Sequence, residues 1–129
     1  MTGLNIQIPW STLLINGDKS VETRSYPLPE KYVGVELGLI ETPGKTGSFK
    51  SRIIGIITFS HCFKYPDKNA WIYDYERHLV KECHPFFSWD DNKPKYGWVV
   101  SNIEKFDEPI PYLKKKGIVF TNLTYSFGV

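Results

Sequence analysis

The sequence predicts an α+β domain, in which a small and mostly antiparallel sheet of five or six strands closes into a barrel beside two short helices. Five or six segments have the alternation or the β-branched content of strands, and turn-forming residues separate most of them. The order strand-helix-strand-strand-strand-helix-strand-strand is not a repeated strand-helix-strand unit, so a doubly wound parallel sheet is not expected. The 129 residues are expected to form one domain over 1–129.

The chain begins with a predicted strand and a short helix. Residues 4–8 alternate apolar and polar side chains as a half-buried strand does. Pro9 suits the first turn of a helix, where its missing N–H costs nothing. Trp10, Leu13 and Leu14 are spaced i, i+3, i+4, so they lie on one face of this helix. Gly17 suits the helix C-cap, so the helix is expected to span about two turns.

Three further strands are expected before the second helix. Residues 21–26 alternate again and are followed by Pro27, which ends a strand. Residues 32–40 and 53–59 are rich in β-branched side chains. The segment between them, residues 42–48, contains the turn formers Pro, Gly and Ser and is expected to be a loop.

The second helix and two strands complete the predicted fold. Asn69 is expected to cap a helix over residues 70–81. The inner side of that helix is expected to contain Ile72, Tyr75 and Leu79. Residues 96–103 and 118–125 are rich in Val, Ile and aromatic side chains and are the last two predicted strands.

Composition and charge exclude several classes of protein. The chain is 41% hydrophobic and 23% charged, which is typical of a globular domain and excludes disorder. No apolar run approaches the ~20 residues of a membrane helix, and the first residues lack the pattern of a secretory signal. The two cysteines, Cys62 and Cys83, cannot form a disulfide framework, so a cytoplasmic location is expected.

Residues 17–24 form the most informative segment, with the sequence Gly-Asp-Lys-Ser-Val-Glu-Thr-Arg. Alternation along the strand places Glu22, Arg24 and Tyr26 on one face. A carboxylate and a guanidinium two residues apart can pair, and Lys19 adds a second cation at the start of the strand. Such a cluster could hold a phosphate or a base edge. The alternative from the chemistry alone is a solvent-exposed row of weak surface ion pairs.

The pattern Gly-x-Lys-x-x-Glu-x-Arg, which follows a helix that begins Pro-Trp, resembles the signature of the ASCH domain family. Here its residues are Gly17, Lys19, Glu22 and Arg24. The resemblance extends along most of the chain. It includes the Ile-Gly-Ile-Ile segment at 54–57, the Tyr-Gly-Trp-Val-Val segment at 96–100, the Glu-Pro-Ile-Pro segment at 108–111 and Gly117.

The resemblance implies a PUA-like β-barrel, related to the EVE and YTH domains, with a cleft beside the first helix. ASCH domains are thought to bind RNA or nucleotides. The resemblance therefore implies a protein that recognises a nucleotide, a modified base or single-stranded RNA in that cleft. It also implies that the binding partner is RNA or a nucleotide, with DNA as an alternative. Binding to a membrane is not expected. The oligomeric state is left open.

Some proteins of this family are enzymes, so a hydrolase is the first alternative. One branch hydrolyses N(4)-acetylcytidine, and another is described as a metal-assisted ribonuclease. In the amidohydrolase branch a lysine activates a threonine three residues later. Lys19 matches the lysine, but Glu22 occupies the position of the nucleophile, and a carboxylate is a poor nucleophile toward an amide. In an enzyme, Glu22 would instead be the general base and Lys19 would stabilise negative charge. A protein-interaction adaptor is the second alternative.

Eight residues are candidate ligand contacts. Lys19 and Arg24 would hold a phosphate or a base edge, and Glu22 would accept a base amino hydrogen. The candidate stacking rings, on which bases of single-stranded RNA are commonly read, are Trp10, Tyr26 and Tyr96. The remaining candidates, Lys45 and Lys50, lie in a basic stretch without acidic residues over 42–53.

Other residues are assigned to structure. Trp98 is expected in the core because of its large apolar area. Phe59, Phe106 and Phe120 are expected in the barrel core or in helix packing. The three lysines at 114–116 are expected to serve solubility and edge protection.

The remaining His, Cys and Asp residues indicate neither a metal nor a cofactor. His61-Cys62 and Cys83-His84 are adjacent pairs, which are poorly suited to chelating one ion, and no C-x-x-C spacing occurs. Asp74 and His78, at i and i+4, are expected to hydrogen-bond and to join the second helix to the barrel. No glycine-rich phosphate loop and no serine-hydrolase elbow is present.

Overall fold

The computed structural model describes residues 1–44, 50–112 and 119–123. Its elements in chain order are β1 (Thr2–Gln7), α1 (Trp10–Ile15), β2 (Val21–Arg24), the 3₁₀ turn η1 (Glu30–Tyr32), β3 (Glu36–Thr42), β4 (Arg52–Lys64), α2 (Lys68–Tyr73), α3 (Tyr75–His78), β5 (Tyr96–Pro111) and β6 (Phe120–Asn122). Among the described residues, no helix is both long enough and apolar enough to cross a membrane.

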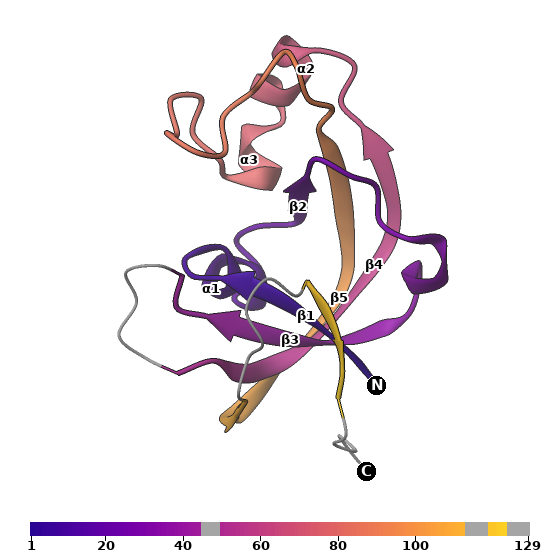
Figure 1. Cartoon of the computed structure of the whole chain (residues 1–129), viewed down its shortest axis with the longest axis vertical. Coiled ribbons are helices and arrows are strands. Elements are labelled where there is room, and N and C mark those ends of the chain that lie inside the picture. The colour runs from indigo at the N-terminus through magenta and orange to yellow at the C-terminus, as the bar shows by residue number, and fades with distance from the viewer. Residues whose placement is uncertain (45–49, 113–118, 124–129) are drawn as a thin grey trace.

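Six strands form one curled sheet in the order β2-β5-β4-β3-β1-β6. Strands β1 and β3 are parallel, and the other four pairs are antiparallel. Figure 1 shows α2 and α3 together at one end of the molecule, while β1, β3 and β6 cross at the other. The predicted α+β class with a mostly antiparallel sheet is confirmed.

Within the described residues, the strands at the two ends of the order, β2 and β6, do not pair with each other. Both end strands are short, at four and three residues. The curl comes instead from β4 and β5, which have 13 and 16 residues and shift register three times along their pairing. Such irregularities bend strands and increase their twist. The sheet is therefore a half-barrel.

The main core fills the hollow of the half-barrel. It contains Leu14 and Ile15 from α1 together with Leu4, Ile6, Leu28, Leu37, Leu39, Ile54, Ile57, Phe59 and Trp98. The predicted core positions of Phe59 and Trp98 are confirmed, since neither side chain is exposed. Phe120 packs against this core, and Phe106 packs against a smaller cluster around Ile53.

A buried carboxylate fixes α1 on the sheet. The Oε2 atom of Glu41 on β3 accepts hydrogen bonds from Ser11 Oγ at 2.8 Å and Thr12 Oγ1 at 3.0 Å. Its Oε1 atom accepts from Arg52 Nε at 3.0 Å and Nη2 at 2.8 Å. Burial raises the pKa of the Glu41 carboxyl, but the hydrogen bonds from Arg52, Ser11 and Thr12 outweigh burial and lower it. Glu41 is therefore ionised and holds α1 against the sheet through Ser11 and Thr12. Trp10 is the first residue of this helix.

The predicted helix over 70–81 is two short helices, α2 and α3. Asp67, and not Asn69, caps α2, because Asp67 Oδ1 accepts from Ala70 N at 2.8 Å. Leu79 adopts φ 60°, a left-handed conformation that ends α3 three residues before the predicted end.

The buried side of these helices also differs from the prediction. Trp71 and His78 are the buried residues, in place of Ile72, Tyr75 and Leu79. The break at Asp74 explains this difference, because it interrupts the 3.6-residue repeat on which the prediction depended.

The expected side-chain hydrogen bond between Asp74 and His78 is wrong. The Asp74 carboxylate accepts from Tyr65 Oη and Arg77 Nε. In the His78 ring, Nδ1 accepts from the backbone N of Val80 at 2.9 Å, and Nε2 lies 2.6 Å from the carbonyl O of Trp71. Burial lowers the pKa of His78, so its imidazole is neutral with the proton on Nε2.

Several strands begin or end elsewhere than predicted. The strand expected over 4–8 is β1, Thr2–Gln7, and the one expected over 21–26 ends at Arg24. The strand expected over 32–40 begins at Glu36, because Gly34 adopts φ 72° after η1. The strand expected over 53–59 continues to Lys64, and the one over 96–103 continues to Pro111. Of the strand expected over 118–125, the described part is β6.

Candidate functional site

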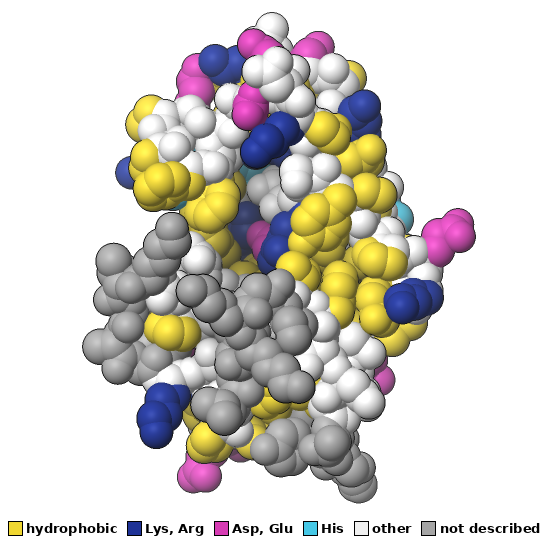
Figure 2. Space-filling model, viewed as in Figure 1, with side chains coloured by type: hydrophobic (Ala, Val, Ile, Leu, Met, Phe, Trp, Pro, Cys, Tyr) yellow, Lys and Arg dark blue, Asp and Glu magenta, His cyan; other side chains and the backbone are white. Residues whose placement is uncertain are grey.

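A cavity of about 520 Å³ opens beside β2, between α1 and the segment that precedes β5. Small-molecule sites in proteins commonly occupy roughly 300–1,000 Å³. Figure 2 shows the hollow with basic and acidic side chains at its bottom and hydrophobic side chains along its rim. The lining residues that the argument uses are Trp10, Lys19, Glu22, Arg24, Tyr26 and Phe87.

Glu22 and Arg24 form the floor of the cavity from β2. Arg24 donates to Glu22 Oε2 through Nε at 3.2 Å and Nη2 at 3.0 Å. Its Nη1 donates to Tyr26 Oη at 3.1 Å, and Nη2 also reaches the carbonyl O of Asn5 at 3.4 Å. Most N–H groups of Arg24 are thus used within the protein, so this residue orients Glu22 and Tyr26.

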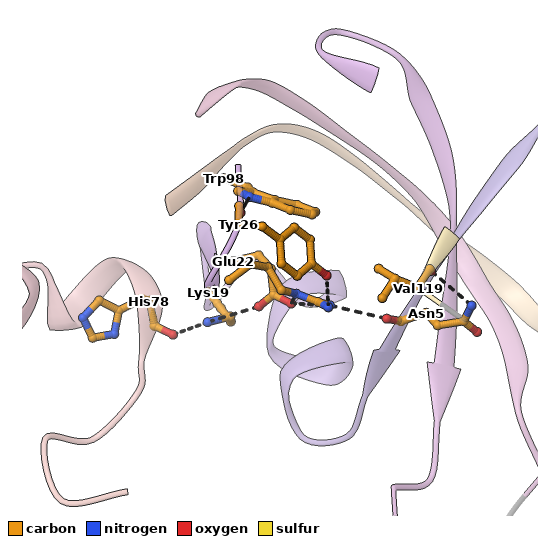
Figure 3. Close-up of polar contacts among 8 residues, drawn as sticks. Asn5, Lys19, Glu22, Tyr26, His78, Trp98 and Val119 are labelled. Atoms are coloured by element: carbon orange, nitrogen blue, oxygen red, sulfur yellow. Dashed lines mark hydrogen bonds and ion pairs between the residues drawn. The ribbon is translucent and has the colours of Figure 1, made fainter. Parts of the chain in front are cut away.

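Lys19 enters the same floor from the turn after α1, where Gly17 adopts φ 82°. Its Nζ donates a hydrogen bond to the carbonyl O of His78 at the end of α3 and lies 3.7 Å from Glu22 Oε1. Figure 3 shows the row from His78 through Lys19 and Glu22 to Asn5. Lys19 Nζ also lies 5.0 Å from the centre of the Trp10 ring.

The cluster is buried, which excludes the solvent-exposed row of ion pairs. Lys19 is 1% exposed and Glu22 is 5% exposed. Burial lowers the pKa of Lys19 from 10.5 to about 8, and the charges of Arg24 and Lys95 act in the same direction, while Glu22 opposes them. Lys19 is therefore charged at neutral pH but loses its proton more readily than a surface lysine.

The charges around the cavity favour an anion. Among the described residues, the cavity is lined by four cations, Lys19, Arg24, Lys93 and Lys95, and by the two carboxylates of Glu22 and Asp90. A cavity with low-dielectric walls and a net positive lining concentrates anionic ligands.

Two of the predicted stacking rings line the cavity. Tyr26 is 37% exposed, and its ring meets that of Trp98 edge-on with the centres 5.8 Å apart. Trp98 Nε1 donates to the carbonyl O of Tyr26 at 3.2 Å, which fixes the backbone there. Trp10 is held between the Lys19 ammonium and the rings of His84 and Phe87, at 5.7 and 6.1 Å.

Two predicted contacts lie elsewhere, and a third is outside the described residues. Tyr96 packs against the main core and is not among the residues that line the cavity, although it pairs with Arg24 across β5 and β2. Lys50 is exposed and does not line the cavity. Lys45 lies outside the described residues, as do the three lysines at 114–116.

The sequence reasoning missed the wall that residues 86–95 build. Phe86, Phe87, Lys93 and Lys95 line the cavity from this segment. The segment has no helix or strand periodicity, so periodicity could not detect it. A usable signal was the adjacent pair of large aromatic residues in a segment that contains one proline and two lysines.

The two Cys/His pairs do not form a metal site in the described structure. His61 and Cys62 lie on β4, and Cys83 and His84 follow α3. Among the residues that the structure describes, no group of three or more His, Cys, Asp or Glu side chains could hold a metal ion.

No protein-family model matches the sequence, and no curated protein matches it either. Solved structures do. The crystal structure of ASCH from Zymomonas mobilis superposes with a TM-score of 0.71 and 14% identity, covering 95% of this chain and 86% of that one. Two mutant proteins of ZmASCH give TM-scores of 0.70 and 0.71, also at 14% identity, covering 95% of this chain and 87% and 88% of theirs.

The chain has the ASCH fold. The predicted resemblance is confirmed at this level, and with it the PUA-like α+β architecture. Within this ASCH fold, three of the signature residues, Lys19, Glu22 and Arg24, meet at the floor of one cavity. The fourth, Gly17, makes the turn that brings Lys19 there.

Proposed function

We propose that the protein binds a nucleotide, a modified base or a segment of single-stranded RNA in the cavity beside α1. The supporting observation is that one cavity combines a buried Lys19–Glu22–Arg24 floor with the rings of Trp10 and Tyr26. Flat bases stack on such rings, and a charged floor in a low dielectric reads their polar edges. DNA remains the alternative polymer.

The hydrogen bonds of the floor assign a different role to each charged group. Glu22 Oε2 accepts both bonds from Arg24, whereas Oε1 is 3.7 Å from Lys19, longer than a hydrogen bond. Oε1 thus keeps acceptor capacity for a base amino group. Lys19 provides positive charge below the base, and the exposed Lys93 at the rim is placed for a phosphate.

Removal of the Lys19 charge tests this proposal. We expect Lys19→Met to weaken binding of short fluorescein-labelled single-stranded RNA by about tenfold or more, the scale of one charged hydrogen bond. Glu22 keeps its Arg24 partner in this variant, so the floor remains paired. Fluorescence anisotropy at two salt concentrations, with DNA of the same sequence as competitor, gives the affinities.

Lys64→Met is the matched control, because it removes the same charge from an exposed position on β4 that does not line the cavity. Its effect should stay within about threefold, the scale of one screened surface charge. If Lys19→Met and Lys64→Met bind RNA equally well, the cavity is not the binding site.

A hydrolase that uses the same cavity is the second candidate, favoured by the lowered pKa of Lys19 beside Glu22. With N(4)-acetylcytidine, Glu22 would take a proton from a water molecule while the oxygen of that water bonds to the amide carbon. The C–N bond would then break, the base nitrogen would receive the proton, and cytidine and acetate would leave. Lys19 would stabilise the oxyanion.

We expect turnover of N(4)-acetylcytidine, or of labelled RNA with or without Mg²⁺, above that of a Glu22→Gln variant. The rate should fall as pH rises through about 8, because Lys19 then loses the charge that stabilises the oxyanion. Product analysis by liquid chromatography at pH 6.5–9 measures both effects. Equal turnover by wild type and Glu22→Gln would remove this candidate.

A further inference from the structure

Two phenylalanines extend the cavity onto the surface. Phe86 and Phe87 both line it, yet Phe86 is 84% exposed and Phe87 is 39% exposed. We call His84, Phe86 and Phe87 the aromatic rim. A single exposed aromatic ring is ordinary on a protein surface. Tyr73, for example, is 90% exposed and lines no part of this cavity.

The aromatic rim is held in place by hydrogen bonds within the protein. His84 Nδ1 accepts from the backbone N of Phe86 and of Phe87, both at 3.1 Å. Lys95 Nζ donates to the carbonyl O of Phe87 at 2.9 Å. Because the turn is already ordered, a ligand that stacks on Phe86 does not bear the entropic cost of ordering it.

Ring contacts connect the rim to the floor. The His84 ring lies 5.0 Å from that of Phe87 and 5.7 Å from that of Trp10, which in turn lies over Lys19. The His84 ring also lies 6.3 Å from that of Phe86, so an aromatic surface runs from the buried floor through Trp10 and His84 to the exposed Phe86. Lys93 lines the cavity from the same segment.

We propose that the ligand is a nucleic-acid strand longer than one nucleotide, with one base in the cavity and a neighbouring base stacked on Phe86. This inference rests on the proposed function, and it narrows the ligand from free nucleotides to a polymer. Successive bases of single strands stack on aromatic side chains while basic side chains follow the phosphates. Phe86 and Lys93 supply these two groups at the mouth of the cavity.

The test compares the affinity for a homopentanucleotide RNA with that for the matching nucleoside 5′-monophosphate, by calorimetry on the full chain for each of the four bases. For wild type we expect the pentanucleotide to bind about tenfold or more tightly. Phe86→Ala should reduce this ratio by about tenfold, the loss of one base–ring stack. Tyr73→Ala, equally exposed but outside the cavity, should leave the ratio unchanged.

The outcomes separate this inference from the proposed function. If wild type binds monophosphates with no gain for pentanucleotides, the inference of a polymer ligand is overturned. If Phe86→Ala leaves the ratio unchanged, the inference that a base stacks on Phe86 is overturned. In both cases the proposed function stands. If wild type binds neither ligand, both are overturned. Thermal unfolding of Phe86→Ala checks folding, and an exposed position predicts little change.

Discussion

Replacing Arg24 by alanine is expected to lower the free energy of unfolding by about 3 kcal/mol or more. Arg24 makes both hydrogen bonds to Glu22 Oε2 and one to Tyr26 Oη. Its loss leaves the Glu22 carboxylate, 5% exposed, with only the Lys19 ammonium at 3.7 Å. A buried carboxylate that has lost its hydrogen-bond donors costs far more than a lost surface contact.

Adding Glu22→Gln to Arg24→Ala should recover about 1 kcal/mol or more, because the double variant no longer buries a carboxylate that lacks a hydrogen-bond donor. Arg77→Ala is the matched control. Its pair with Asp74, at 2.6 Å, has side chains 47% and 18% exposed, so its loss should cost less than about 1 kcal/mol. Urea denaturation followed by circular dichroism measures all three. Equal losses for Arg24→Ala and Arg77→Ala would show that the buried pair contributes no more than a surface pair.

The period of two along residues 21–26 predicted Glu22, Arg24 and Tyr26 on one face of a strand. The strand β2 ends at Arg24, so Tyr26 lies beyond it, and Arg24 bonds to both Glu22 and Tyr26. The burial of Glu22 was not predictable from that strand. It depends on groups distant in sequence, such as the His78 carbonyl and the Phe87 wall. Local patterns therefore indicated which residues meet but not the environment in which they meet.

The second helix shows the same limit. Its composition suits one amphipathic helix, yet Asp74 bonds to Tyr65 and Arg77, and Leu79 takes a left-handed conformation. These bonds stabilise a break that helix propensity cannot anticipate. The break matters for the site, because it turns the His78 carbonyl toward Lys19.

Trp98 links the core of the half-barrel to the cavity. Its side chain is fully buried, with ring centres 5.6 Å from Phe59 and 6.1 Å from Phe120. On the cavity side, Arg24 lies over its ring at 5.6 Å, and its Nε1 donates to the carbonyl O of Tyr26. Stability and the position of the cavity floor therefore depend on the same ring.

Trp98→Ala is consequently expected to lower the free energy of unfolding by about 3–5 kcal/mol, the range for removing a buried tryptophan ring. Trp98→Phe keeps most of the apolar area but loses the hydrogen bond to Tyr26, so it should cost about 1–3 kcal/mol. Trp89→Ala, at a partly buried position, is the control of the same residue type. Urea denaturation followed by circular dichroism gives the three values. Were Trp98→Ala no more costly than Trp89→Ala, Trp98 could not be the ring that joins the core to the cavity floor.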